Sequence, residues 1–153
     1  MNKFDNEITS STQAVPHAPK YKLYSVRAVG WGSFLGSCLA GGHFIAMNWL
    51  RLGYPKRAVM TYFISVIVLL LSFLLGDLLR DLPSVFIYLP VILSFMAWVK
   101  SQQGELLELH LRQNGEMESA WKIFGVAILY LIIIFSLLFM LLAVFPDTFD
   151  LSI

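Results

Sequence analysis

The side chains that could do chemistry are concentrated in one apolar stretch, residues 29–50. His43 is an ionisable group within this stretch, which indicates proton handling or metal binding if the stretch lies in a membrane. Cys38 is the nearest second ligand, but five residues separate the two side chains by about 140° around a helix. A metal site needs several converging ligands, and no other apolar stretch supplies a Cys or His. We therefore treat His43 and Asn48 as a possible polar site and expect no metal or cofactor.

Hydrolysis is the other reaction that these residue types could support. It would need a serine and a histidine delivered by different helices, together with donors for an oxyanion. Ser33, Ser37 and His43 lie on one segment instead, and the other apolar stretches carry only scattered hydroxyls. Such hydroxyls commonly bond back to their own helix. We expect the protein not to be an enzyme.

Small residues give the same stretch a role in close packing. Gly32 and Gly36 form a G-x-x-x-G pair, Ala40 continues the row at four-residue spacing, and Gly41 and Gly42 follow. In a membrane such rows let another helix approach the backbone closely. These five residues predict a surface for helix packing or for binding a partner.

The composition indicates that the helices carrying these residues lie in a membrane. Of 153 residues, 58% are apolar and 14% charged, against about 45–50% and about 25% in soluble domains. Residues 58–75, 82–99 and 123–145 are apolar stretches long enough to cross a hydrocarbon core of roughly 30 Å. We predict an all-α polytopic integral membrane protein with three transmembrane helices. A net charge of +1 offers no basic surface for nucleic acid.

The Gly-rich stretch at residues 29–50 leaves three arrangements open. It could lie in the interface, re-enter as a hairpin that reverses at Gly41 and Gly42, or form a fourth transmembrane helix. Four crossings would divide the Lys and Arg residues five to six between the two sides of the membrane. Without this crossing, Arg80 stands alone on one side and ten lie on the other (Lys3, Lys20, Lys22, Arg27, Arg51, Lys56, Arg57, Lys100, Arg112, Lys122). The positive-inside rule favours that split and therefore a re-entrant or interfacial helix.

Two polar segments flank or interrupt the helical membrane domain predicted at residues 23–153. Residues 1–22 are expected to be a disordered cytoplasmic tail. Residues 100–122 keep leucines at helical spacing, so we expect a cytoplasmic helical hairpin that extends the third span and turns at Asn114 and Gly115. Glu116 and Glu118 would then lie in the first turn of the last helix. With three crossings and the basic side in the cytoplasm, we expect the N-terminus in the cytoplasm and the C-terminus on the outer side of a cell inner membrane.

Part of the Gly-rich region follows a pattern. The positions that carry it are Leu23-Tyr24-Ser25, Phe34-Leu35-Gly36-Ser37, Leu39-Ala40-Gly41-Gly42, Asn48, Leu52-Gly53 and Ala58. This run resembles a family of small bacterial inner-membrane proteins of unassigned function. The resemblance covers about a quarter of the chain, and Cys38 departs from it where a proline or another small residue is expected. It implies an inner-membrane location and brings no activity with it.

These observations predict a non-catalytic multi-pass inner-membrane protein that acts by binding. Besides the lipid bilayer, its partner would be another membrane protein or a second copy of the chain. The role would be that of an accessory subunit, or of an immunity-type protein that occupies a toxin's target or pore. The alternative is a small carrier or channel that uses the Gly-rich segment and His43.

Overall fold

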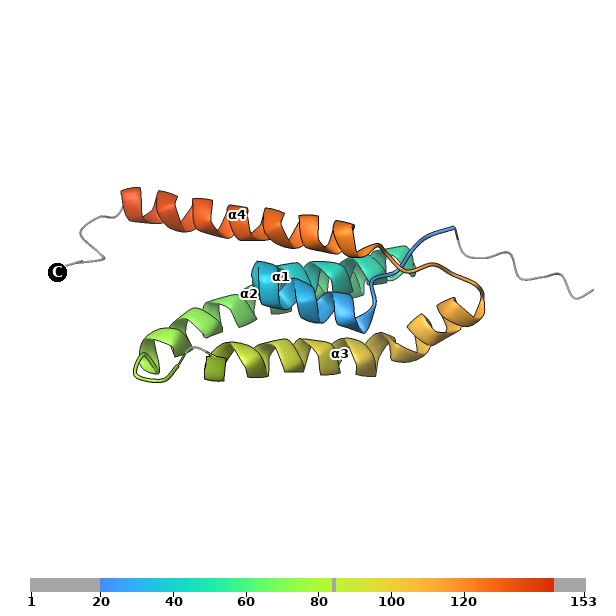
Figure 1. Cartoon of the computed structure of the whole chain (residues 1–153), viewed down its shortest axis with the longest axis horizontal. Coiled ribbons are helices and arrows are strands. Elements are labelled where there is room, and N and C mark those ends of the chain that lie inside the picture. The colour runs from blue at the N-terminus through green and yellow to red at the C-terminus, as the bar shows by residue number, and fades with distance from the viewer. Residues whose placement is uncertain (1–19, 84, 145–153) are drawn as a thin grey trace, which may run out of the picture.

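The computed structural model describes residues 20–83 and 85–144, which form four helices. They are α1 (Val26–Arg51), α2 (Pro55–Leu78), α3 (Val85–Arg112) and α4 (Ala120–Val144). Helices α2, α3 and α4 have 24 to 28 residues and are long and apolar enough to cross a membrane (Figure 1). The prediction of an all-α membrane protein with three such helices is confirmed. The tail at residues 1–19 and the C-terminal end beyond Val144 lie outside the described residues.

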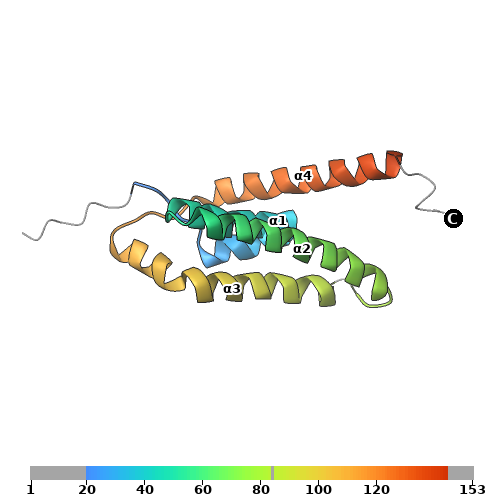
Figure 2. The ribbon, with the colours of Figure 1, turned by 180° about the vertical axis from the view of Figure 1, so that it is seen from behind.

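Helix α1 is a hairpin of two antiparallel arms, residues 26–36 and 38–51. Figures 1 and 2 show both arms side by side, with the start and the end of α1 at the same end of the molecule. Tyr24, before the first arm, hydrogen-bonds to Asn48, near the end of the second. The arms are about 16 Å and 21 Å long at 1.5 Å per residue, so neither could cross a hydrocarbon core of about 30 Å.

The reversal lies at Gly36 and Ser37, whose backbone angles are not helical. The prediction that the hairpin breaks at Gly41 and Gly42 is therefore wrong. Those two glycines lie inside the second arm, where their missing side chains make room for neighbours. The row of small residues at four-residue spacing is also interrupted, because the chain reverses between Gly36 and Ala40.

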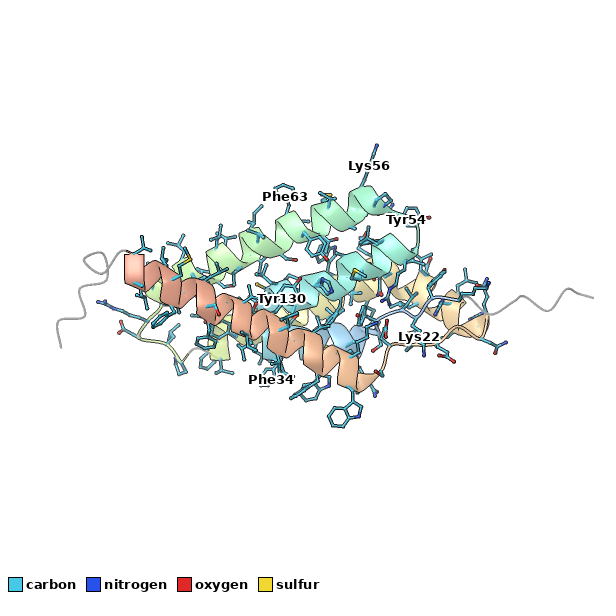
Figure 3. All side chains as sticks on the ribbon, turned by 90° about the horizontal axis from the view of Figure 1, so that it is seen from above. Lys22, Phe34, Tyr54, Lys56, Phe63 and Tyr130 are labelled. Carbon is cyan, nitrogen blue, oxygen red and sulfur yellow. The ribbon has the colours of Figure 1, made fainter. Side chains whose placement is uncertain are left out.

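The hairpin lies at the centre of the bundle. Helices α2, α3 and α4 each pack extensively against α1, whereas α2 and α3 touch each other little. In Figure 3 the α2 residue Phe63 points away from the bundle, as expected of a helix that packs on one side only. Because its arms are shorter than the three long helices, the hairpin fills only about half of the length over which these helices run (Figure 2).

The connection between α3 and α4 differs from the predicted helical hairpin. Helix α3 continues without interruption to Arg112, and a turn follows in which Asn114 has a φ of 58°. Helix α4 then begins at Ala120, so Glu116 and Glu118 precede it and do not lie in its first turn. Met117 pairs with Leu23 in an isolated β-bridge, in which the Leu23 N–H donates to the Glu116 carbonyl oxygen and the Glu118 N–H donates to the Leu23 carbonyl oxygen.

Candidate functional site

The glycines of the hairpin mark the places where other elements come closest. A side chain at Gly32 would strike Phe44 of the second arm, and one at Gly41 would strike Ser33 of the first. Gly42 faces Ser65 of α2. The two arms and α2 can therefore approach at backbone distance, which is how helices pack tightly in a membrane.

Gly36 makes the contact between the hairpin tip and α4. A Cβ atom added there would lie 2.5 Å from the carbonyl oxygen of Ala127 and 2.8 Å from its Cα. Because backbone atoms cannot move aside as a flexible side chain can, a larger residue at Gly36 would push α4 away. The Cβ atom of Ala40, a fully buried residue of the second arm, would lie 2.7 Å from the same added atom.

A buried amide network fixes the base of the hairpin. Asn48 accepts a hydrogen bond from the Tyr24 backbone N–H and donates one to its carbonyl oxygen, both at 2.8 Å. It also donates to Gln103 Oε1 of α3 at 3.0 Å, and Gln103 Nε2 donates to the carbonyl oxygen of Ile45 at 3.0 Å. Asn48 and Gln103 are fully buried. Removing either amide would leave buried polar groups without partners, which costs about 1–3 kcal/mol for each group.

Charged side chains close the same end of the molecule. Arg51 pairs with Glu118 at 2.8 Å, and Glu118 also pairs with Lys122. Burial opposes ionisation of Glu118, yet its hydrogen bonds from Lys122 and Arg51 prevail and lower the pKa of the carboxyl group. Lys22 pairs with Glu116, and this contact raises the pKa of Lys22 and lowers that of Glu116. The segment before α1 and the loop before α4 are thus tied to the hairpin.

His43 lies where three elements meet. The hydroxyl of Tyr62 on α2 is 2.8 Å from its Nδ1 atom, and the hydroxyl of Tyr130 on α4 is 3.1 Å away. When the ring proton is on Nε2, Nδ1 can accept a hydrogen bond from a phenol. The cluster therefore links the second arm to two of the long helices; Figure 3 shows Tyr130 on α4 beside the hairpin.

One face of α4 is left open, and we name it the Gly125 face. It consists of the residues of α4 within about 40° of Gly125 around the helix, all of them exposed: Trp121, Gly125, Leu129, Ile132, Ser136, Phe139, Ala143. Ala127, which contacts Gly36, is the buried residue of α4 and lies about 200° from Gly125. No described atom lies within 4 Å of where a Cβ atom of Gly125 would be.

The structure does not bring the residues of the predicted polar site into one cluster. His43 and Asn48 lie on the same arm but belong to separate clusters, around Tyr62 and Tyr130 in one case and around Gln103 in the other. Cys38 donates a weak hydrogen bond to the Ser65 carbonyl oxygen at 3.7 Å. Among the described residues, no three His, Cys, Asp or Glu side chains converge as metal ligands would.

Sequence reasoning missed Gln103, Tyr62, Tyr130 and the Gly125 face. Gln103 lies in a polar segment, and its sequence neighbours do not show that its side chain turns inward. Gly125 carried a usable signal, because a glycine inside an exposed helix costs about 1 kcal/mol relative to alanine and so calls for a reason.

Comparison with known proteins finds no relative of this chain. No protein-family model, no curated protein and no solved structure matches the chain.

Proposed function

We propose that this multi-pass membrane protein is non-catalytic and acts by binding a transmembrane helix of another membrane protein. It would serve as an accessory subunit, or as an immunity-type protein that occupies a toxin's membrane target or pore. The observation that carries the proposal is the Gly125 face of α4. This helix packs on the hairpin through the side that bears Ala127 and exposes the opposite side.

Gly125 is the central residue of this face. Within the described part of the chain, nothing approaches it closely enough to require a glycine. A partner helix would require one, because close backbone approach is the usual role of an exposed glycine on a membrane helix. Leu129 and Ile132 would then flank the contact. Ser136, one turn beyond Ile132, would supply a second small residue.

The proposed setting is a bacterial-type inner membrane with the N-terminus in the cytoplasm. The distribution of basic residues supports this orientation. In the described residues, Arg80 lies between α2 and α3, and the other nine Lys and Arg residues belong to segments on the far side of a three-crossing topology. In Figure 3 Lys22, Tyr54 and Lys56 lie in the same half of the molecule.

Photocrosslinking in the native membrane tests the proposal. A photoreactive amino acid in place of Leu129 should give a discrete protein adduct. The same amino acid at Leu137, which is exposed but lies about 120° from Gly125, should not. Gly125→Leu should abolish the Leu129 adduct. Gly76→Leu is the matched control, because Gly76 also has open space where a Cβ atom would lie.

The mass of the adduct separates the possible partners. An adduct larger by another protein's mass supports the accessory or immunity role, and its identity decides between them. An adduct of twice the chain's mass means that the partner is a second copy. Lipid adducts alone, or equal adducts at Leu129 and Leu137, would contradict the proposal.

The second candidate function is a small proton carrier or channel. The His43 cluster favours it, because an ionisable side chain between two phenols at the centre of three helices offers groups that can exchange protons. In this role His43 would titrate during transport, whereas in the binding role it would serve only to join the helices.

A further inference from the structure

The half of the bundle that the hairpin leaves unfilled contains a cavity of about 450 Å³. All four helices contribute to its wall, which is mainly apolar: Phe34 and Leu35 at the hairpin tip, Leu69 of α2, Leu89 of α3 and Leu131 of α4. Its size falls within the range of about 300–1,000 Å³ that is typical of ligand sites. The cavity exists because α1 reverses before it reaches the loop between α2 and α3.

A second, more polar cavity of about 430 Å³ lies next to the first. Asp77, in the last turn of α2, and Arg80, just beyond the end of this helix, line the second cavity. The two cavities share Ser72 of α2 and Tyr88 of α3 as lining residues. Together they form one depression, which we name the outer groove, running from the hairpin tip to the loop between α2 and α3.

The outer groove has the depth of one membrane leaflet. Leu69 and Asp77 are eight residues apart on α2, which corresponds to about 12 Å along a helix. Half of a hydrocarbon core measures about 15 Å. The apolar part of the groove therefore matches the depth of an acyl chain, and the charged part matches the level of a headgroup.

The charges at the mouth indicate which headgroup fits. Asp77 and Arg80 are three residues apart, and neither forms an ion pair with another described residue. An arginine guanidinium matches the geometry of a phosphate, and an aspartate carboxylate matches an ammonium group. A headgroup with phosphate alone would satisfy Arg80 but would bring its negative charge close to Asp77.

We propose that the outer groove binds one phospholipid whose headgroup carries both a phosphate and a primary ammonium. One acyl chain lies against the hairpin tip, the phosphate contacts Arg80, and the ammonium contacts Asp77. This site is independent of the proposed partner-binding face, because Leu131, its residue on α4, lies about 120° around the helix from Gly125. Loss of the Leu129 adduct in Gly125→Leu would not affect it.

Native mass spectrometry of the purified full-length protein in mild detergent tests the proposal. The probes are phosphatidylethanolamine and phosphatidylglycerol with identical acyl chains, added at equal concentration. We expect one phosphatidylethanolamine to be retained per chain, in preference to phosphatidylglycerol. Asp77→Asn and Arg80→Gln should each weaken its retention by about threefold to fivefold, the range expected when one partly exposed charge pair is lost.

Matched variants separate the groove from the surface in general. Asp81→Asn should have no effect, because Asp81 carries the same charge four residues after Asp77 but does not line either cavity. Leu89→Trp should fill the apolar part and expel the lipid, whereas Leu93→Trp, one turn further along α3 and similarly exposed, should not.

Three results would overturn the proposal. They are equal retention of the two lipids or preference for phosphatidylglycerol, equal effects of Asp77→Asn and Asp81→Asn, and retention that Leu89→Trp does not change. Asp77→Asn and Arg80→Gln alter exposed side chains, so they keep the test decisive even if the tryptophan variant fails to fold.

Discussion

His43 is the residue on which the two candidate functions differ. Its Nδ1 atom is within hydrogen-bonding distance of Tyr62 on α2 and Tyr130 on α4, so the ring holds three helices together. A carrier would need this ring to gain and lose a proton during each cycle, and the hydrogen bonds at Nδ1 would have to rearrange each time. A binding protein needs only the stable contact.

Proton flux into liposomes tests the role of His43. We predict that liposomes with the purified protein show the same flux as protein-free liposomes, and that His43→Gln changes nothing. Glutamine can still accept a hydrogen bond, so the variant should lose no more than about 1 kcal/mol of unfolding free energy. A flux that requires the protein and disappears in His43→Gln would favour the carrier.

The sequence drew attention to two polar residues of the hairpin but not to the side chains that contact them. His43 and Asn48 stand out because polar groups are rare in an apolar stretch. Gln103, Tyr62 and Tyr130 do not, because each comes from another helix, and only packing decides which of its faces turns toward the hairpin.

The backbone of the hairpin is strained at Ser37. Its φ is 70° and its ψ is 177°, a region that is essentially restricted to glycine and costs other residues about 1–3 kcal/mol. Its Oγ atom partly compensates by accepting a hydrogen bond from the Leu39 N–H at 3.3 Å. Ser37 therefore acts as the N-terminal cap of the second arm while its own backbone is strained.

Two substitutions at Ser37 separate strain from capping. Ser37→Gly should raise the free energy of unfolding by about 1 kcal/mol, because glycine relieves the strain and loses only a few tenths as a cap. Ser37→Ala keeps the strain and loses the cap, so it should lower that free energy by about 1 kcal/mol. Unfolding in mixed micelles, followed by circular dichroism, measures both. Equal destabilisation by glycine and alanine would mean that the turn is not strained.

The sequence predicted the hairpin better than its turn. The uneven distribution of Lys and Arg indicated that residues 29–50 do not cross the membrane, and the short arms agree with this. The break was assigned to Gly41 and Gly42 because two adjacent glycines are a strong turn signal. Here they serve close packing instead, and the weaker signal of Gly36 followed by a capping serine marks the true reversal.

The hairpin explains why three long helices can share one bundle although they pack little on one another. It fills the centre of one half, where glycines let α2, α3 and α4 approach it, and leaves the other half to the outer groove. Composition and apolar length were sufficient to predict the class of protein and its three long helices. They could not predict this arrangement, because it depends on contacts between the hairpin and all three helices.

Cysteine labelling in intact cells tests whether α1 enters and leaves the membrane on the same side. Cys38 is first replaced by serine, and single cysteines are then introduced at the exposed positions Lys20, Lys56 and Asp81. With a membrane-impermeant maleimide, we predict that Asp81→Cys is labelled from outside, whereas Lys20→Cys and Lys56→Cys are labelled only after the membrane is opened. If Lys56→Cys is labelled from outside and Asp81→Cys is not, α1 crosses the membrane, and the re-entrant hairpin is contradicted.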